Sequence, residues 1–166
     1  MDKVQKALDD LERKATKSVK IISKGEKLSV GDAIKLGRKT NSMISTMKKA
    51  VKGYEGTTPT EEESQKILAQ SKRMVELSEA QLDHLISLKP HIEKLHVGGL
   101  VKKSMLRTQA ASGELENVMR EKSPENLKAE GEALAKRKQA VFEKALAAFA
   151  NSTGGEDQAE GEDDSD

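Results

Sequence analysis

The chain has 166 residues, of which 35% are hydrophobic, with one Tyr, two Phe and no Trp. It contains no Cys, which excludes a disulfide framework, a thiolate zinc site and a cysteine nucleophile. No stretch approaches the roughly 20 apolar residues of a membrane span, so we expect no transmembrane segment. A chain of this length fits one domain, whose core must be built mainly from Leu, Ile, Val, Met and Ala.

The net charge of +1 conceals two parts of opposite sign. The last sixteen residues contain seven acids and no base, which leaves 29 basic and 21 acidic residues in the first 150, a net charge of +8. A segment so poor in apolar residues cannot bury enough surface to fold by itself. We therefore expect a folded domain over residues 1–150 and a disordered acidic tail over residues 151–166.

Apolar residues spaced three and four apart predict amphipathic helices along most of the chain. The first predicted helix spans residues 3–23 and ends near Gly25, which suits the left-handed conformation that closes a helix. The second begins after Ser29, a candidate N-cap with Asp32 three residues later, and extends to about residue 54.

Turn and cap residues predict three more helices. The third begins near Thr60 and ends before Pro90, because proline lacks a backbone donor and clashes with the preceding turn. The fourth begins near Gly99, and the fifth follows Ser123 as N-cap and Pro124 as first helical residue. No segment alternates like a half-buried strand. The predicted fold is all-α, a five-helix antiparallel bundle.

The sequence offers little for metal, catalytic or nucleic-acid chemistry. His84, His91 and His96 are seven and five positions apart, not the three or four that place two ligands on one helix face. No nucleophile elbow, P-loop or dinucleotide motif occurs, so we expect neither an enzyme nor a cofactor. The pair Gly98 and Gly99 could hold an anion, but a flexible turn is favoured. Basic residues are interspersed with acids and lack aromatic stacking partners, so no nucleic-acid partner is expected.

The inward-facing stripes combine Met with small or hydroxylated residues, and two interpretations remain open. In one, small residues let the helices approach closely and the hydroxyls bond to carbonyls one turn earlier. In the other, the helices enclose an apolar cavity softened by Met, with a few hydroxyls to orient a polar head group.

Two segments, "LISLKPHIEKLHVGGLVKKSM" and "GELENVMREKSPENLKAEGEALAKRKQAVFEKALAAFA", resemble the hydrophobic surface-binding protein A family, which includes antigenic cell-wall galactomannoproteins of fungi. The shared pattern is a Lys-Pro and a Gly pair before helix four, a Lys-x-Pro-x-x-Leu start to helix five, and a final helix ending in Phe and Ala. The matching positions are Lys89, Pro90, Ile92, Leu95, Gly98, Gly99, Leu115, Lys122, Pro124, Leu127, Leu134, Phe142, Phe149 and Ala150. The first half fits more loosely, and the resemblance covers residues 3–150.

The resemblance implies a secreted, non-enzymatic five-helix protein of the fungal cell wall, whose signal peptide has been removed from this chain. It implies binding of fatty acids inside the bundle, or alternatively a surface-active adhesin that binds hydrophobic surfaces and recruits a secreted hydrolase. Asn151, followed by Ser152 and Thr153, is an N-glycosylation acceptor compatible with secretion.

The leading hypothesis is therefore a fatty acid or similar amphipathic lipid bound between the helices. Lys138 interrupts the stripe of the fifth helix and is expected to reach solvent or meet an anion. The irregular connection at residues 90–99 is the predicted point of lipid entry. The candidate cavity-lining residues are Ile44, Met47, Met74, Ser78, Leu85, Met105, Thr108, Ser112, Leu115, Met119, Leu134, Lys138, Val141 and Phe142.

Overall fold

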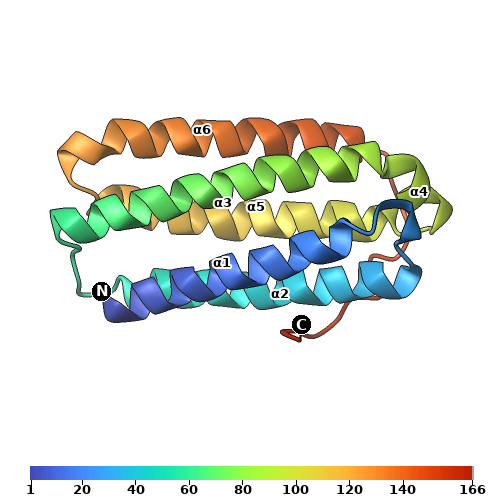
Figure 1. The fold of residues 1–166 in the computed structure, drawn as a ribbon, viewed down its shortest axis with the longest axis horizontal. Helices are drawn as coiled ribbons and strands as arrows, with labels where there is room; N and C mark the ends of the chain where they lie inside the picture. Colours follow the sequence, from blue (N-terminus) through green and yellow to red (C-terminus); the bar gives the residue numbers. More distant parts are fainter. Residues whose placement is uncertain (166) are drawn as a thin grey trace.

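The structure, a computed structural model, describes residues 1–165, which contain helices but no strand. A 3-10 turn, η1 (Gly25–Lys27), connects the first two of six α-helices. The five long helices lie side by side, and consecutive ones run antiparallel (Figure 1), which confirms the all-α bundle. The α-helices are α1 (Asp2–Ile22), α2 (Val30–Gly53), α3 (Glu61–Ser87), α4 (Lys89–Lys94), α5 (Gly98–Lys122) and α6 (Glu125–Ala148).

The predicted number of five helices is wrong by one, because a short helix, α4, occupies the connection after α3. Pro90 lies in the first turn of α4. Backbone N–H groups in a first turn have no acceptor within the helix, so the N–H that proline lacks costs no hydrogen bond there. Leu88, Ile92 and Val97 are buried around this turn, and the ring of His91 hydrogen-bonds the Leu28 carbonyl over 2.8 Å. The connection is therefore packed firmly against one end of the bundle.

The predicted helix starts are correct at α2 and α3. The Ser29 hydroxyl accepts from the Asp32 N–H over 3.1 Å, and the Asp32 carboxylate accepts from the Ser29 N–H over 3.0 Å. Thr60 forms the same reciprocal pair with Glu63. The predicted Ser123 N-cap is wrong, because Ser123 caps the end of α5 and α6 begins only after Pro124.

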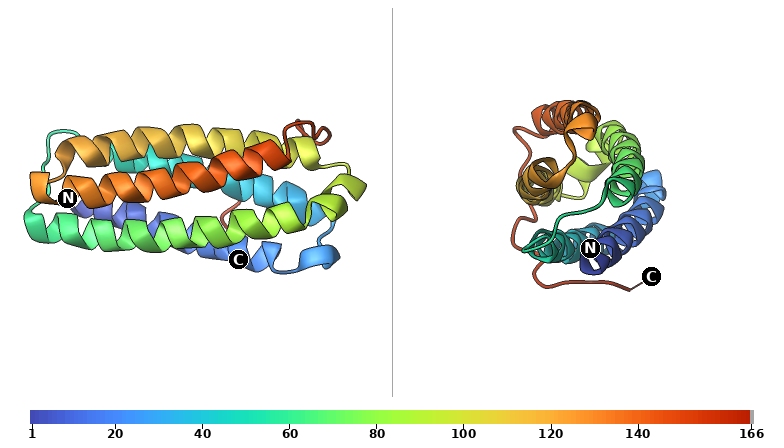
Figure 2. Two further views of the ribbon diagram at one scale, coloured as in Figure 1. Left: turned by 90° about the horizontal axis from the view of Figure 1, so that it is seen from above. Right: turned by 90° about the vertical axis from the view of Figure 1, so that its left-hand side faces the viewer.

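The five long helices form a closed ring. Going round it, α1 packs against α2, α2 against α5, α5 against α6, α6 against α3, and α3 against α1. The end-on view in Figure 2 shows this ring directly. The helices of two of these pairs, α1 with α3 and α5 with α6, pack together less extensively than those of the other three, and we call these interfaces the thin seams. A ring of five helices has an interior that side chains must fill, and here they are mostly aliphatic.

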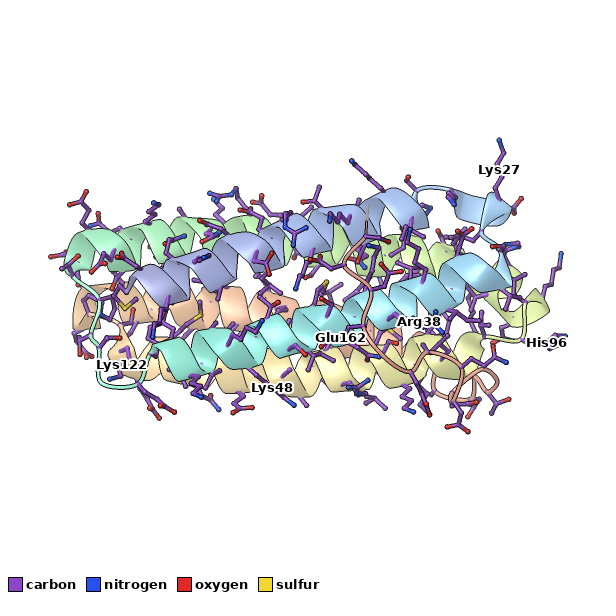
Figure 3. The ribbon with its side chains drawn as sticks, turned by 90° about the horizontal axis from the view of Figure 1, so that it is seen from below. Lys27, Arg38, Lys48, His96, Lys122 and Glu162 are labelled. Carbon is purple, nitrogen blue, oxygen red and sulfur yellow. The ribbon has the colours of Figure 1, made fainter. Side chains whose placement is uncertain are left out.

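The expectation of a disordered tail is not confirmed. Residues 151–165 leave the end of α6, pass the start of α5 and run across α2 toward α1 (Figures 2 and 3). The composition of the tail alone predicts disorder, whereas in the structure its acids meet cations of the basic bundle, as in the 3.0 Å pair of Arg13 and Asp164. Asp166, the last residue of the predicted tail, lies outside the described residues.

Candidate functional site

Two elongated cavities, of about 170 and 100 Å³, lie inside the ring. All five long helices line the larger, which extends toward Tyr54 and Pro59. The smaller extends toward α4 and is lined mainly by α2, α3 and α5. Both are lined by Met43, Ser78, Gln81 and Phe142, so they adjoin at these side chains. Together they follow the long axis of the bundle.

The cavity wall is mainly apolar and rich in methionine. Met43, Met47, Met74 and Met119 line the larger cavity, and Met105 lines the smaller. Methionine is unbranched and polarizable, so its side chain adapts to gaps and to ligands of different shape. The wall therefore suits a flexible apolar guest.

The structure brings twelve of the fourteen sequence-predicted residues to the cavity wall. Ile44 and Val141 do not line either cavity but are buried in the packed core, 5% and 8% exposed. Each is adjacent in sequence to a lining residue, Met43 or Phe142, so its side chain points away from the cavity by the rotation of one helical position. The twelve are Met47, Met74, Ser78, Leu85, Met105, Thr108, Ser112, Leu115, Met119, Leu134, Lys138 and Phe142.

Several polar groups of the wall already have protein partners. The Thr108 hydroxyl donates to the Ser104 carbonyl over 2.8 Å, within its own helix. The Lys138 ammonium donates to the Ser112 hydroxyl and forms an ion pair with Glu116. Lys138 thus meets an anion, as expected of a largely buried ammonium, and these contacts span the thin seam between α5 and α6.

Ser78 and Gln81 are the polar side chains at the junction of the two cavities. They are three residues apart on one face of α3, and neither side chain forms a hydrogen bond with another described residue. Gln81 was not predicted from the sequence, although its spacing from Ser78 could have indicated it. The pair presents free donors to the middle of the interior.

A second unpaired group lies near the far end of the larger cavity. The Ser64 hydroxyl is buried and has no hydrogen-bond partner among the described residues. It lines the cavity together with Tyr54, whose pKa burial raises to about 12. Because an unpaired buried hydroxyl is unfavourable, this end favours a ligand atom or water that accepts from it.

The glycine pair at residues 98 and 99 takes a different form from the one expected from the sequence. Gly98 and Gly99 are the first residues of α5 rather than the flexible turn that was favoured. Within residues 1–165, no group of three or more His, Cys, Asp or Glu side chains is placed to hold a metal ion. In the same part of the chain, none of the helices is both long and apolar enough to cross a bilayer.

Known proteins share this fold. Ligand binding domain 2 of the Penicillium marneffei MP1 protein, solved in complex with arachidonic acids, has 21% identity and a TM-score of 0.82, covering 92% of this chain and 96% of that chain. Afmp4p, solved in complex with palmitic acid, has 17% identity and a TM-score of 0.79, covering 88% of this chain and 99% of that chain. Ligand binding domain 1 of the MP1 protein, with arachidonic acids, has 20% identity, a TM-score of 0.76, and coverage of 87% and 95%.

The sequence itself matches one protein family. Residues 1–121 match hydrophobic surface binding protein A, a region that contains α1 to α4 and nearly all of α5. The resemblance seen in the sequence is thereby confirmed, although it was strongest further along the chain. No curated protein sequence matches the chain. Since the family match covers well over half of its length, the chain belongs to the hydrophobic surface binding protein A family.

Proposed function

We propose that this protein binds a fatty acid, or a similar amphipathic lipid, in the cavities between its five long helices. The observation that carries this proposal is the pair of adjoining apolar cavities along the bundle axis. The solved structures with this fold that contain arachidonic or palmitic acid support it.

The dimensions suit a long acyl chain. The lining residues of α3 run from Ser64 to Leu85, which corresponds to about 30 Å at ~1.5 Å per residue. The hydrocarbon core of a bilayer, which holds two opposed layers of acyl chains, is also about 30 Å thick. One chain therefore fits at full extension. Each methylene transferred from water contributes roughly 0.8 kcal/mol, offset by the freedom that the ligand and the side chains lose.

Ser78 and Gln81 are the proposed head-group site. A carboxylate only accepts hydrogen bonds, and these two side chains offer a hydroxyl and an amide donor that no described residue uses. Ser112 and Lys138 are less suitable because the Glu116 ion pair already satisfies the ammonium. The acyl chain would then extend from this point into the larger cavity and contact the apolar residues of the twelve that line it.

Secretion to the fungal cell surface and a non-enzymatic role are part of the proposal, and family membership supports both. Asn151 is exposed where the tail begins and is accessible to glycosylation. Adhesion to hydrophobic surfaces, with recruitment of a secreted hydrolase, is the second candidate. The thin seams beside α3 and α6 favour it, because a ring with two weak seams can open and spread its apolar faces.

Native mass spectrometry of protein purified without lipid extraction tests the lipid proposal, together with calorimetric titration of palmitate. We expect a co-purifying lipid and saturable binding. A protein that carries no lipid and releases no heat with palmitate contradicts the proposal. Adsorption to hydrophobic beads, with helical content kept and tertiary packing lost, would then favour the adhesin.

A further inference from the structure

The acidic tail covers the seam between α2 and α5. The Leu100 N–H donates to the Gly154 carbonyl over 2.9 Å, and the Asn41 amide donates to the carbonyls of Ala159 and Gly161 over 2.9 and 2.8 Å. Gly37 and Leu100 line the smaller cavity from inside. Tail residues contact the same two residues from outside, so the tail forms an outer layer over this cavity.

Glycines allow this close contact on the bundle side. A Cβ atom at Gly37 would lie 2.5 Å from the Ala159 Cβ, and one at Gly98 would lie 2.8 Å from the Ser152 Cβ. A Cβ atom at Gly99 would lie 1.8 Å from an oxygen of Glu156, whose carboxylate sits over the N-terminus of α5. Any other residue at these positions would push the tail away, so the bundle is shaped to receive it.

The last part of the tail is held by cations of α1 and α2, which we call the basic face: Arg13, Lys17, Arg38 and Lys39. Arg13 donates to both Asp164 carboxylate oxygens over 3.0 Å, and Lys17 donates to the Asp164 carbonyl over 2.9 Å. Figure 3 shows the tail beside Arg38, which donates to the Glu160 carbonyl over 3.0 Å. Lys39, only 3% exposed beneath the tail, lies 3.8 Å from the Asp163 carboxylate.

These ion pairs are easily exchanged. The Arg13 and Asp164 side chains are both exposed, and exposed ion pairs are weak and screened by salt. An anionic surface that presents many charges at once can therefore compete with the tail for the same four cations.

We propose that the basic face is a binding surface for an anionic lipid bilayer, that the tail masks it by occupying the same cations, and that bilayer binding lifts the tail from the seam above the smaller cavity. The choice of a bilayer as partner rests on the proposed function, since a fatty-acid ligand comes from lipid. Docking there would place the uncovered seam against the source of the ligand.

Sedimentation with vesicles tests the proposal on the full-length chain, without any added fatty acid. The test variant is the double substitution Asp163→Asn and Asp164→Asn, which removes the two carboxylates that pair with Arg13 and Lys39 of the basic face. The control is Asp157→Asn with Glu160→Gln, because it changes the net charge equally at carboxylates that pair with no described residue. The vesicles are phosphatidylcholine alone or with about one third phosphatidylglycerol.

We expect wild-type protein to bind only the anionic vesicles, less so as salt is raised. The test variant should bind them about fivefold more tightly than wild-type, because its tail no longer competes, and the control should match wild-type. On vesicles, the amide protons of Leu100 and Asp163 should exchange faster, since both donate across the tail interface. Equal binding by the two variants, or unchanged exchange of these amides, would overturn the proposal.

Two further outcomes are decisive. If heparin releases the tail whereas anionic vesicles bind no better than neutral ones, the partner is a soluble polyanion and the assignment to a bilayer is wrong. The calorimetric titration with palmitate fails or succeeds independently, because vesicle binding uses the outer face and not the cavities. If vesicles release the tail but palmitate does not bind, the proposal for the basic face is supported and the proposal of a lipid bound between the helices is contradicted.

Discussion

At the scale of single residues, the interior is distinguished by which polar groups already have partners. Thr108 and Lys138 line the cavities but are bonded to protein groups. Ser78 and Gln81 have no such partner among the described residues. An apolar wall with two free donors where the cavities adjoin both admits an acyl chain and orients its head group.

Replacing Gln81 by Leu should weaken palmitate binding at least about tenfold, because hydrogen bonds to charged groups are worth about 1.5–3 kcal/mol. Binding of methyl palmitate should change much less, since the ester lacks the charge. Thr108→Val is the matched control, because the hydroxyl it removes already bonds within its helix. Calorimetry measures all three proteins, and equal losses for Gln81→Leu and Thr108→Val would contradict the assignment of the head-group site.

Twelve of the fourteen residues predicted from the sequence line the cavities, because helical periodicity determines which face of a helix turns inward, although many other lining residues were not singled out. The failure at Ile44 and Val141 shows the limit, since a rotation of one position decides between cavity wall and packed core. The free donors of Gln81 and Ser64 were not predictable, because being unpaired depends on every neighbouring helix. These are properties of tertiary contacts rather than of local sequence.

At the scale of helices and segments, local signals gave the starts of α2 and α3 correctly. Both capping boxes depend on residues three positions apart. The docked tail depends on distant partners, since Arg13 and Asp164 are far apart in sequence. Its own composition indicated disorder, and only the charge and the glycines of the bundle could have indicated docking.

Removing either N-cap should destabilise the protein without affecting the ligand. Ser29→Ala and Thr60→Ala should each lower the free energy of unfolding by about 1 kcal/mol, because each leaves helix N–H groups without an acceptor. Thr16→Ala is the control, since Thr16 lies inside α1 and bonds only to the Glu12 carbonyl. Urea unfolding gives the three values, and a Thr16→Ala loss as large as the others would contradict this account of the caps.

Docking of the tail should be lost in acid. The Arg13 guanidinium of the bundle lowers the pKa of Asp164 from its ordinary value of 3.8. A carboxylate whose pKa is lowered by docking stabilises the docked tail above its ordinary pKa and stops doing so as the pH falls through the lowered one. NMR shifts of residues 151–165 should therefore be constant near neutral pH and move toward those of a released tail below about pH 4.

The double substitution Asp163→Asn and Asp164→Asn provides the comparison for the acid titration. Its tail should show released shifts already at neutral pH, whereas Asp157→Asn with Glu160→Gln should titrate like wild-type. Unchanged shifts in the first variant would mean that the backbone contacts of the tail suffice to hold it.

At the scale of the whole molecule, the five long helices enclose an interior that their side chains do not fill. Few aromatic residues are available, and the chain closes into a ring rather than collapsing onto one central helix. One helix-interior glycine allows this interior to be filled experimentally, and a second provides the control. Gly131 lines the larger cavity and Gly113 lines neither, and a Cβ atom at either position would meet nothing within 4 Å.

The most direct test of the lipid proposal is native mass spectrometry of wild-type, Gly131→Leu and Gly113→Leu after exposure to palmitate. Both substitutions remove a glycine from a helix interior and should stabilise that helix similarly, by about 1 kcal/mol or less. Only the side chain introduced by Gly131→Leu would occupy the cavity, so we predict palmitate complexes for wild-type and Gly113→Leu and none for Gly131→Leu. Complexes in equal amount on all three proteins, or on none, would contradict a fatty acid bound between the helices.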